Sequence, residues 1–458
     1  MKPYPDYKPT GLAWLPEIPK HWDWIMLSQI ATEQCNKNAE RTERNVLSLS
    51  YGRIIQKKNL FAGLSPQDYG TYQIISPGNI VMRLTDLQND HKSLRTGLAE
   101  MRGIITSAYT CLKTNHNPAF LHYLLHCYDI RKVFYGLGGG VRQSIGFKDI
   151  RGLRFPFPPA DEQAQIVRYL DAMTAKINKL IRAKKRQIAL LQEQKQAIIN
   201  QAVTRGLDPD VELKDSGIDW LGPIPKPWKI MTMSRLSQTV RGASPRPAGD
   251  SRFFEGNTIP WITVSELTKD ESKYLEKTAT YLTEEGQKQS RTINSDTLLL
   301  SNSGATLGVP KISHIMGCIN DGVVAFLSPK ENIEFLYYAL KNQTINLRKI
   351  VEGYGQPNLN TTIVKNIIVA IPPLNIQHDI VEYLDKKCSD INFIIEQYQK
   401  IIEQYIEYKN SLIAAVVTGQ VDVRNIAVEV VSPEDLAPSD DPDESEEQDS
   451  PVSEESEE

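Results

Sequence analysis

The sequence lacks the features that mark several large classes of protein. Its 458 residues contain no run of about 20 apolar residues, the length that spans a bilayer. The N-terminal stretch MKPYPDYKPTG has no apolar segment of the signal-peptide kind. The five cysteines form no CxxC pair, which argues against a disulfide framework and against a zinc site. These absences predict a cytoplasmic protein with no membrane partner.

Motifs of self-contained catalytic sites are also missing. The chain has no P-loop, no intact GxGxxG and no HExxH zinc motif among its seven histidines. An adenine methyltransferase would carry Asn or Asp, two prolines and an aromatic residue. The nearest strings, 157–160 (FPPA) and 371–374 (IPPL), lack both outer residues, and each begins a predicted helix. The sequence therefore predicts a chain that is not an enzyme and that binds no metal or cofactor itself.

Basic residues are absent from 432–458, a segment with 13 acidic residues. The remaining chain, 1–431, carries 52 basic against 43 acidic residues, a net charge of +9, although the whole chain carries −4. A tail rich in Ser, Pro, Asp and Glu is typical of disorder. Its simpler role is to aid solubility, and the alternative is that it competes with DNA for basic surface.

A long helical segment occurs twice. Between 158–204 and 372–418, without a gap, 17 of 47 positions are identical. Both copies open with two prolines, which cannot lie inside a helix, followed by a capping residue, Asp161 or Asn375. The first copy stops at Gly206. A second repeat, GLAWLPEIPKHW at 11–22 and GIDWLGPIPKPW at 217–228, matches at seven of twelve positions. The chain is therefore a tandem duplication.

The stretches between the repeats differ from each other and look mixed α/β. Apolar runs bounded by turn signals predict strands, and helices are expected at about 118–133 and 331–350. We therefore expect two globular α/β domains separated by a pair of long antiparallel coiled-coil helices, as a pseudo-twofold repeat. The expected divisions are 1–157, 158–206, 207–371, 372–425 and an acidic tail, 426–458.

Each long helix carries one apolar stripe with steps of three and four residues, and these stripes predict that the helices pair with each other. The first stripe includes Leu180 and the second includes Lys387 and Ile394, with one extra four-residue step near Lys184. At 1.5 Å per residue such a helix spans roughly 65 Å, about 19 base pairs of duplex DNA. Eight stripe residues are predicted to serve partner docking: Ile166, Leu170, Ile177, Ile188, Ile380, Leu384, Ile391 and Ile402.

Candidate DNA-binding residues are more abundant than catalytic ones. Basic side chains suit phosphates, and Arg, Gln, Asn and Ser on loops suit base edges. For any single residue, closing a turn or capping a helix is the simpler role. The first domain offers Arg53, Lys57, Lys58, Arg83, Arg95, Arg102, Arg142, Gln143 and Ser144. The second offers Arg241, Arg246, Arg252, Asn302, Ser303, Lys311, Gln356, Asn358 and Asn360.

The strings GIDWLGPIPKPW and IPPLNIQHDIVEYLDKKCSDIN, together with SNSGATLG at 301–308 and GQPNLN at 355–360, resemble the specificity subunits of type I restriction-modification systems. The resemblance extends to about Val423. It implies a non-catalytic subunit in which each target recognition domain binds one half of a bipartite double-stranded DNA sequence. The unlike domains imply an asymmetric target.

The resemblance also implies partners. Two methylation subunits would dock on the helices, bring S-adenosylmethionine and methylate adenine N6, and restriction subunits would use ATP and Mg. Two other interpretations stay open: a stand-alone DNA-modifying enzyme with a divergent site, and a non-catalytic coiled-coil adaptor.

Overall fold

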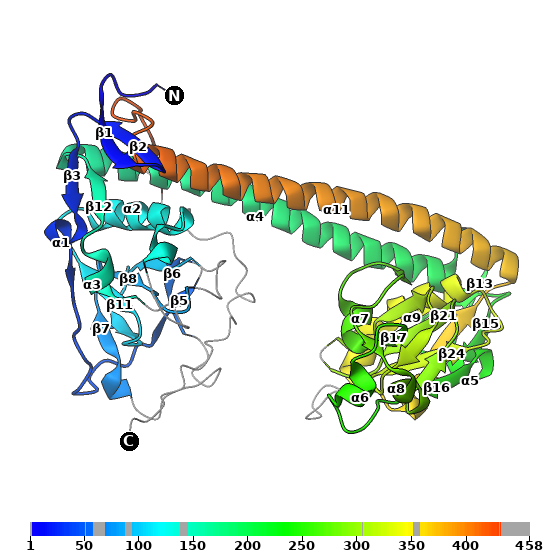
Figure 1. Cartoon of the computed structure of the whole chain (residues 1–458). Helices are drawn as coiled ribbons and strands as arrows, with labels where there is room; N and C mark the ends of the chain where they lie inside the picture. The colour runs from blue at the N-terminus through cyan, green and yellow to red at the C-terminus, as the bar shows by residue number, and fades with distance from the viewer. Residues whose placement is uncertain are drawn as a thin grey trace. The chain divides into compact units, whose positions relative to one another are not determined.

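The computed structural model describes residues 2–50, 52–57, 69–87, 94–137, 145–304, 306–350, 358–429 and 431. The chain divides into two compact units. Unit 1 comprises Met1–Arg186 with Tyr398–Glu458, and unit 2 comprises Gln187–Gln397. Each unit therefore contains one globular stretch and parts of both long helices, α4 (Ala160–Arg205) and α11 (Leu374–Val417) (Figure 1). No helix among the described residues is long and apolar enough to cross a membrane.

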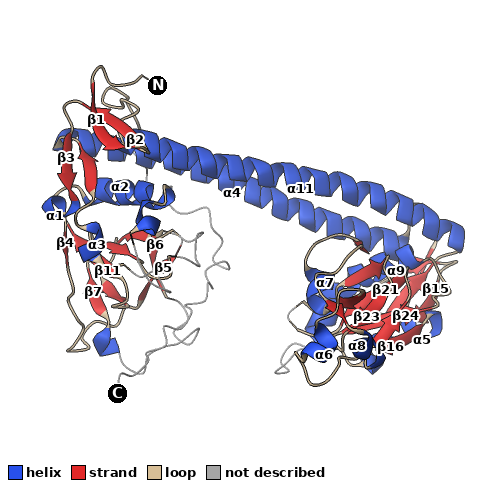
Figure 2. Cartoon of the chain, viewed as in Figure 1, coloured by secondary structure: helices blue, strands red, loops and turns tan. Residues whose placement is uncertain are grey.

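Unit 1 builds its globular part from short strands, mostly antiparallel (Figure 2). Its largest sheet has the order β4 (Thr32–Glu33), β11 (Thr110–Lys113), β8 (Ile80–Met82), β9 (Thr96–Leu98). Smaller pairs are β1 (Tyr7–Leu12) with β2 (Leu15–Pro19), β5 (Leu47–Ser50) with β6 (Arg53–Gln56), and β7 (Gln73–Ile75) with β10 (Gly103–Ile105). Short helices are α1 (Leu27–Ile30), η1 (Tyr69–Thr71), η2 (Val133–Gly136) and α3 (Phe147–Ile150).

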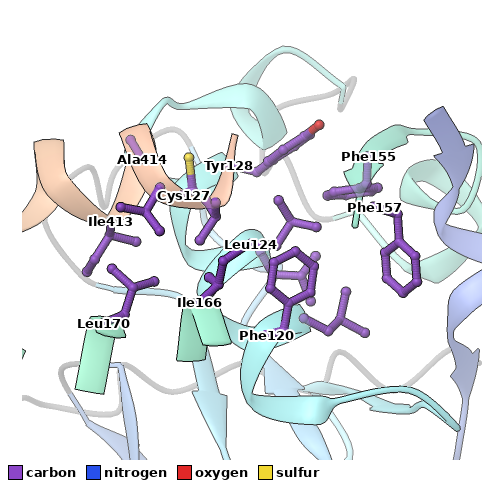
Figure 3. Packing of buried hydrophobic residues seen from close by; sticks show 14 of the residues in the cluster. Phe120, Leu124, Cys127, Tyr128, Phe155, Phe157, Ile166, Leu170, Ile413 and Ala414 are labelled. Carbon is purple, nitrogen blue, oxygen red and sulfur yellow. The ribbon is translucent and has the colours of Figure 1, made fainter. Parts of the chain in front are cut away.

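The core of unit 1 lies where α2 (Pro118–Ile130) packs between the strands and the long helices. Asn117 caps α2 by accepting from the N–H groups of Ala119 and Phe120, both at 3.1 Å. Figure 3 shows Phe120 and Leu124 of α2 directed toward Ile166 of α4. One core therefore joins the globular part to both long helices.

Unit 2 has larger sheets. A five-stranded sheet has the order β16 (Gln238–Arg241), β24 (Val323–Leu327), β21 (Thr297–Ser301), β22 (Pro310–Ser313), β18 (Tyr274–Leu275). A four-stranded sheet has the order β19 (Tyr281–Leu282), β17 (Ile259–Ile262), β23 (Gly317–Ile319), β20 (Arg291–Ile293). The pair β13 (Leu213–Lys214) and β14 (Ile224–Pro225) precedes them. The helices are α5 (Met233–Leu236), α6 (Ser251–Phe254), α7 (Val264–Thr268), α8 (Glu284–Lys288), α9 (Ile333–Ile350) and α10 (Thr361–Lys365).

A common scaffold surrounds these unlike sheets. In unit 1, β12 (Arg154–Phe157) pairs antiparallel with β3 (Asp23–Met26), directly before α4. In unit 2, β25 (Ile368–Ile371) pairs antiparallel with β15 (Lys229–Thr232), directly before α11. The helices expected at about 118–133 and 331–350 are confirmed as α2 and α9.

Two repeated side-chain bonds explain identities in the sequence. Gln163 donates through Nε2 to the carbonyl of Pro158 at 2.8 Å, and Gln377 donates to that of Pro372 at 2.9 Å. Each bond satisfies a backbone carbonyl at the start of a long helix. The duplicated glutamine is therefore a local structural element rather than a site residue.

The sequence Tyr-Leu-Asp occurs at 169–171 in α4 and again at 383–385 in α11, and its Asp joins each long helix to its globular part. Tyr123 of α2 donates to Asp171 of α4 at 2.8 Å, and Tyr338 of α9 donates to Asp385 of α11 at 2.5 Å. Burial raises the pKa of the Asp171 carboxyl, and the bond from Tyr123 opposes that rise. In unit 2, Lys273 adds an ion pair to Asp385 at 2.7 Å.

The far ends of the long helices contact the Trp-Pro motifs. Gly206, at φ +80°, follows α4, and a Cβ there would lie 3.3 Å from Trp228. Gly419, at φ +76°, follows α11, and a Cβ there would lie 3.2 Å from Trp22 and 2.3 Å from Pro19. Glycine tolerates both the left-handed backbone and this close approach. The repeated Trp-Pro motif therefore receives the end of a long helix in each unit.

The helices run antiparallel and are held by a matched pair of polar bonds. In unit 1, Lys409 donates to Asn178 at 3.2 Å, and in unit 2, Lys195 donates to Asn392 at 3.0 Å. Both residues of each pair are among the positions that the duplication preserves. Near the midpoint, Lys184 Nζ lies 3.9 Å from the ring centroid of Tyr398. Polar groups at such seams favour one register and orientation.

The predicted seam is wrong at the same place in both copies. Leu180 and Ile394 are 47% and 39% exposed, whereas their neighbours Ile181 and Ile395 are 0% and 8% exposed. Lys387 is also exposed. The extra four-residue step runs from Ile177 to Ile181 and from Ile391 to Ile395, one to two turns before the predicted step near Lys184. Ile181 and Ile395 therefore lie in the interface in place of Leu180 and Ile394.

The expected C-terminal boundaries also need correction. The second long helix ends at Val417, eight residues before the expected 425. The segment after it belongs to unit 1, because Gln165 donates to the carbonyls of Val423 and Ile426 at 3.0 and 2.8 Å. Residues 426–429 are therefore part of the folded unit, and 432–458 lie outside the described residues.

The paired Tyr–Asp bonds give a matched test of the scaffold. We expect Tyr123→Phe to lower the free energy of local opening at α2 by about 1–3 kcal/mol, because the Asp171 carboxylate loses its donor. Tyr338→Phe should cost less at α9, because Asp385 keeps Lys273. Amide hydrogen exchange of α2 and α9 measures both values. Equal losses in the two units would contradict this account.

Candidate nucleic-acid interface

One end of the unit 2 sheets gathers exposed polar side chains from three loops. The first loop follows β16, the second is the turn between β23 and β24, and the third follows β21. We call the group formed by Arg241, Ser244, Arg246 and Asp321 the arginine cluster. It brings together two arginines that the sequence predicted as DNA-binding residues.

Asp321 connects the other members of the arginine cluster. Its carboxylate accepts a hydrogen bond from Ser244 Oγ at 2.5 Å and lies 3.7 Å from Arg246 Nη2. Its backbone carbonyl accepts from Arg241 Nε at 2.7 Å. The side chains of Arg246 and Asp321 are 72% and 47% exposed. Both arginines therefore keep guanidinium N–H groups at the surface.

The backbone beneath the arginine cluster is closely packed. The N–H of Gly242 donates to Val323 at 2.9 Å, and that of Ala243 donates to Ile319 at 3.1 Å. A Cβ at Gly242 would lie 2.0 Å from the carbonyl oxygen of Asn320, so only glycine fits there. The backbone N–H of Arg246 donates to Gln289 Oε1 at 3.2 Å. The loop is thus anchored at its base and again at Arg246.

The two motifs that resembled a target recognition domain lie next to each other and to this turn. Ser303 and Asn358 form an isolated antiparallel bridge. The N–H of Asn302 donates to Gly322 at 2.9 Å, beside Asp321. Ser303 is half-buried and Asn358 is exposed. The SNSG and NLN segments, distant in the sequence, thus meet beside the arginine cluster.

Asn360 and Asn302 serve the fold. Asn360 caps α10 by accepting from the N–H of Ile363 at 2.9 Å. Asn302 is fully buried, and its Nδ2 donates to the carbonyl of Leu359 at 3.3 Å. The simpler role, capping and turn closure, describes both residues.

Two basic candidates are inside the domains, so the expectation that they contact phosphates does not fit the structure. Arg95 is 0% exposed and donates to the carbonyl of Thr85 at 2.7 Å and to Tyr135 Oη at 2.9 Å. Lys311 is 1% exposed and pairs with Asp270 at 2.6 Å. Burial alone would raise the pKa of Asp270, but the bond from Lys311 lowers it. Both cations fasten loops from within.

The other unit 1 candidates lie on separate elements. Arg53 begins β6, Lys57 follows it, and Arg83 follows β8, all three half-buried. Arg102 is exposed and pairs with Glu43 at 3.0 Å. The hydrogen bond from the backbone N–H of Asn45 lowers the pKa of the Glu43 carboxyl most, and the hydrogen bond from Arg102 lowers it further. The remaining candidates lie outside the described residues: Lys58, Arg142, Gln143, Ser144 and Gln356.

The eight predicted docking side chains lie largely inside the chain's own cores. Six are less than 9% exposed, namely Ile166, Leu170, Ile177, Ile380, Leu384 and Ile391. Ile188 and Ile402 are half-buried. A partner would therefore meet other helix residues. Leu180 and Ile394, the two exposed positions at the misassigned seam step, occupy equivalent places in the repeat.

Asp321 and Ser244 were missed by the sequence argument. Asn320-Asp321-Gly322 stands between two apolar strands, a pattern that indicates a tight turn. That signal could have located the turn. The two loops that contact it, however, carry Ser244 and Asn302, about 80 and 20 residues earlier in the chain. Only the fold places them together.

The chain matches a family model described as the type I restriction modification DNA specificity domain, over residues 104–190 and 225–404. It is 26% identical over 353 residues to the type I restriction enzyme MjaVIII specificity subunit of Methanocaldococcus jannaschii, covering 71% of this chain and 76% of that one. It is 23% identical over 440 residues to a putative type I restriction enzyme MjaX specificity subunit of the same organism, covering 92% and 97%.

A solved structure from work on assembly and conformational transition of the type I R-M system has a TM-score of 0.63. It is 15% identical and covers 88% of this chain and 99% of that chain. This likeness shows a shared fold.

Proposed function

The chain belongs to the family of type I restriction-modification DNA specificity domains, and we propose that it is the DNA sequence-specificity subunit of a type I complex. Each unit recognises one half of a bipartite target. One observation carries the proposal: the same scaffold contacts recur in both units, whereas the sheets they support differ. Unlike domains on a repeated scaffold suit an asymmetric DNA sequence.

The proposed partners are double-stranded DNA, two methylation subunits and restriction subunits. In this proposal the methylation subunits hold S-adenosylmethionine and methylate adenine N6, while ATP and Mg belong to the restriction subunits. The specificity chain contributes recognition and docking. Its net charge of +9 over 1–431 supports a polyanionic partner.

The docking surface we propose includes Leu180 of α4 and Ile394 of α11. Among the described residues of the two long helices, this is the pair of equivalent positions at which both side chains are large, apolar and exposed. Two equivalent positions suit two copies of one partner. Leu190, 54% exposed, has Gln404 as its equivalent and so offers an unmatched control.

Methylation mapping tests the proposed function directly. The full chain is produced with its methylation subunits in a host that lacks adenine methylation, and modified adenines are located by genome sequencing. We expect a split motif with two unlike halves, methylated on both strands. A continuous site, or no methylation with all subunits present, would contradict the proposal. S-adenosylmethionine binding or DNA nicking by the chain alone would favour the stand-alone enzyme.

The helix pair should set the spacer between the two halves of the target. We remove seven residues from α4 between Asn178 and Lys195 and seven from α11 between Asn392 and Lys409. This keeps both Lys–Asn bonds and the heptad pattern. At 1.5 Å per residue the segment shortens by ~10.5 Å, roughly three base pairs.

We expect the methylated motif to keep its halves and lose about three spacer base pairs. Removing seven residues from α4 alone mispairs the seam and should abolish methylation. An unchanged spacer in the double deletion would refute the role of the helix pair.

Charge placed at the proposed docking positions should remove partners one at a time. Leu180→Glu and Ile394→Glu should each leave a complex with one methylation subunit, and the double variant a chain with none, because a desolvated carboxylate is costly at an interface. Native mass spectrometry reports the stoichiometry. Leu190→Glu should keep both subunits. Loss in that control, or full assembly of the double variant, would rule this surface out.

A further inference from the structure

The arginine cluster has the properties of a base-recognition site rather than of a stabilising ion pair. Arg246 and Asp321 are well exposed, and their closest charged atoms are 3.7 Å apart. Exposed pairs of this kind contribute little to folding, because solvent screens them. Yet the loop and the turn that carry them are fixed by several backbone bonds and by a glycine that admits no side chain. The fold therefore holds a pair that does little to stabilise it.

The two arginines are held differently. Arg241 donates through Nε to a backbone carbonyl, whereas Nη2 of Arg246 lies 3.7 Å from Oδ2 of Asp321, an ionic contact longer than a hydrogen bond. The carboxylate attracts that end of the guanidinium and leaves the other N–H groups of Arg246 available as a fork. That fork matches the O6 and N7 acceptors of guanine in the major groove. Pre-positioning also reduces the side-chain entropy lost on binding.

We propose that Arg246 recognises a guanine in the half-site bound by unit 2 and that Asp321 is the residue that positions it. This inference rests on the proposed function. Ser244, bonded to the second carboxylate oxygen, fixes the Asp321 rotamer. Asp321 acts through Arg246 and does not itself contact the base, because its carboxylate oxygens are directed to Ser244 and Arg246.

The main alternative is that Arg246 contacts a phosphate. Lysine retains a phosphate contact but cannot present the bidentate fork, so Arg246→Lys separates the two roles. Arg235 provides a control in the same unit. It is exposed on α5, before the start of β16, outside the arginine cluster.

The experiment uses the full chain assembled with its methylation subunits and a pool of DNA duplexes in which every base of both half-sites is randomised. Bound duplexes are sequenced, and the preference at each position is compared among variants. We expect Arg246→Lys to lower the preference for guanine at one position of one half-site roughly tenfold or more. Arg235→Lys should leave every preference unchanged.

The positioning role of Asp321 is tested by a double-variant comparison. Asp321→Asn should cause a smaller loss at the same guanine, because Asn keeps the acceptor for Ser244 but not the charge for Arg246. Asp321→Asn combined with Arg246→Lys should lose no more than Arg246→Lys alone. The effect of Arg241→Ala on base preference should, by contrast, be additive with that of Asp321→Asn, because Arg241 donates to the backbone carbonyl of Asp321 and not to its carboxylate.

Each outcome decides between the possibilities. Unchanged guanine preference in Arg246→Lys, or an equal loss of affinity for all sequences, would overturn the base contact. A loss in the double variant equal to the product of both single losses would overturn the positioning role. A wild-type complex without preference in either half-site would instead refute the proposed function, so the two failures are distinguishable.

Discussion

The apolar seams of α4 and α11 must be buried against each other, and the rest of the architecture depends on that requirement. In unit 1, Ile166 and Leu170 share a core with Leu412 and Val416. Each fully buried aliphatic side chain contributes about 1.5–3 kcal/mol relative to an exposed one. Because the pairing is antiparallel, the end of α11 returns to unit 1, where Gly419 meets Trp22. The duplicated Trp-Pro motif is explained by this return, since each unit must receive one helix end.

Polar bonds between elements account for much of what the duplication preserved. Gln163 and Gln377, Asp171 and Asp385, and Lys195 and Lys409 each repeat both the residue and its contact. An apolar contact accepts many substitutions of similar volume, whereas a hydrogen bond requires both partners.

Glu162 is a polar residue of α4 that the duplication did not preserve. Glu162 is buried and accepts bonds from Tyr4, His21 and Trp22. Its equivalent, Ile376, packs against the apolar core of unit 2. One donor, His21, corresponds to Pro227 in the second copy, and the acceptor differs there too, although Trp22 is repeated as Trp228.

The sequence predicted the elements better than it predicted their faces. Proline breaks and apolar periodicity located both long helices to within a few residues at their N-termini, because those signals are local. The expected caps were wrong, since Asp161 and Asn375 lie inside helices that begin at Ala160 and Leu374. The seam failed at Leu180 and Ile394, where the next residue is also apolar and periodicity cannot choose between them. The choice is made by packing against the partner helix, which the sequence does not order. The predicted end of the second long helix was wrong for a similar reason, because residues 418–429 are held by tertiary contacts within unit 1.

The DNA-binding candidates show why residue type and positive charge do not define a recognition site. Arg95 and Lys311 could bind phosphate by their charge, but they instead donate to carbonyls and to a carboxylate inside their domains. Arg241 and Arg246 have the same chemistry at the surface, and the difference lies in Asp321, an acidic residue in a chain segment that charge counting would pass over. Attraction to DNA follows from the net charge, which acts at any sequence. Discrimination between bases requires donors fixed in direction, and in the proposal for Arg246 that direction comes from Asp321 and from the loop packed at Gly242.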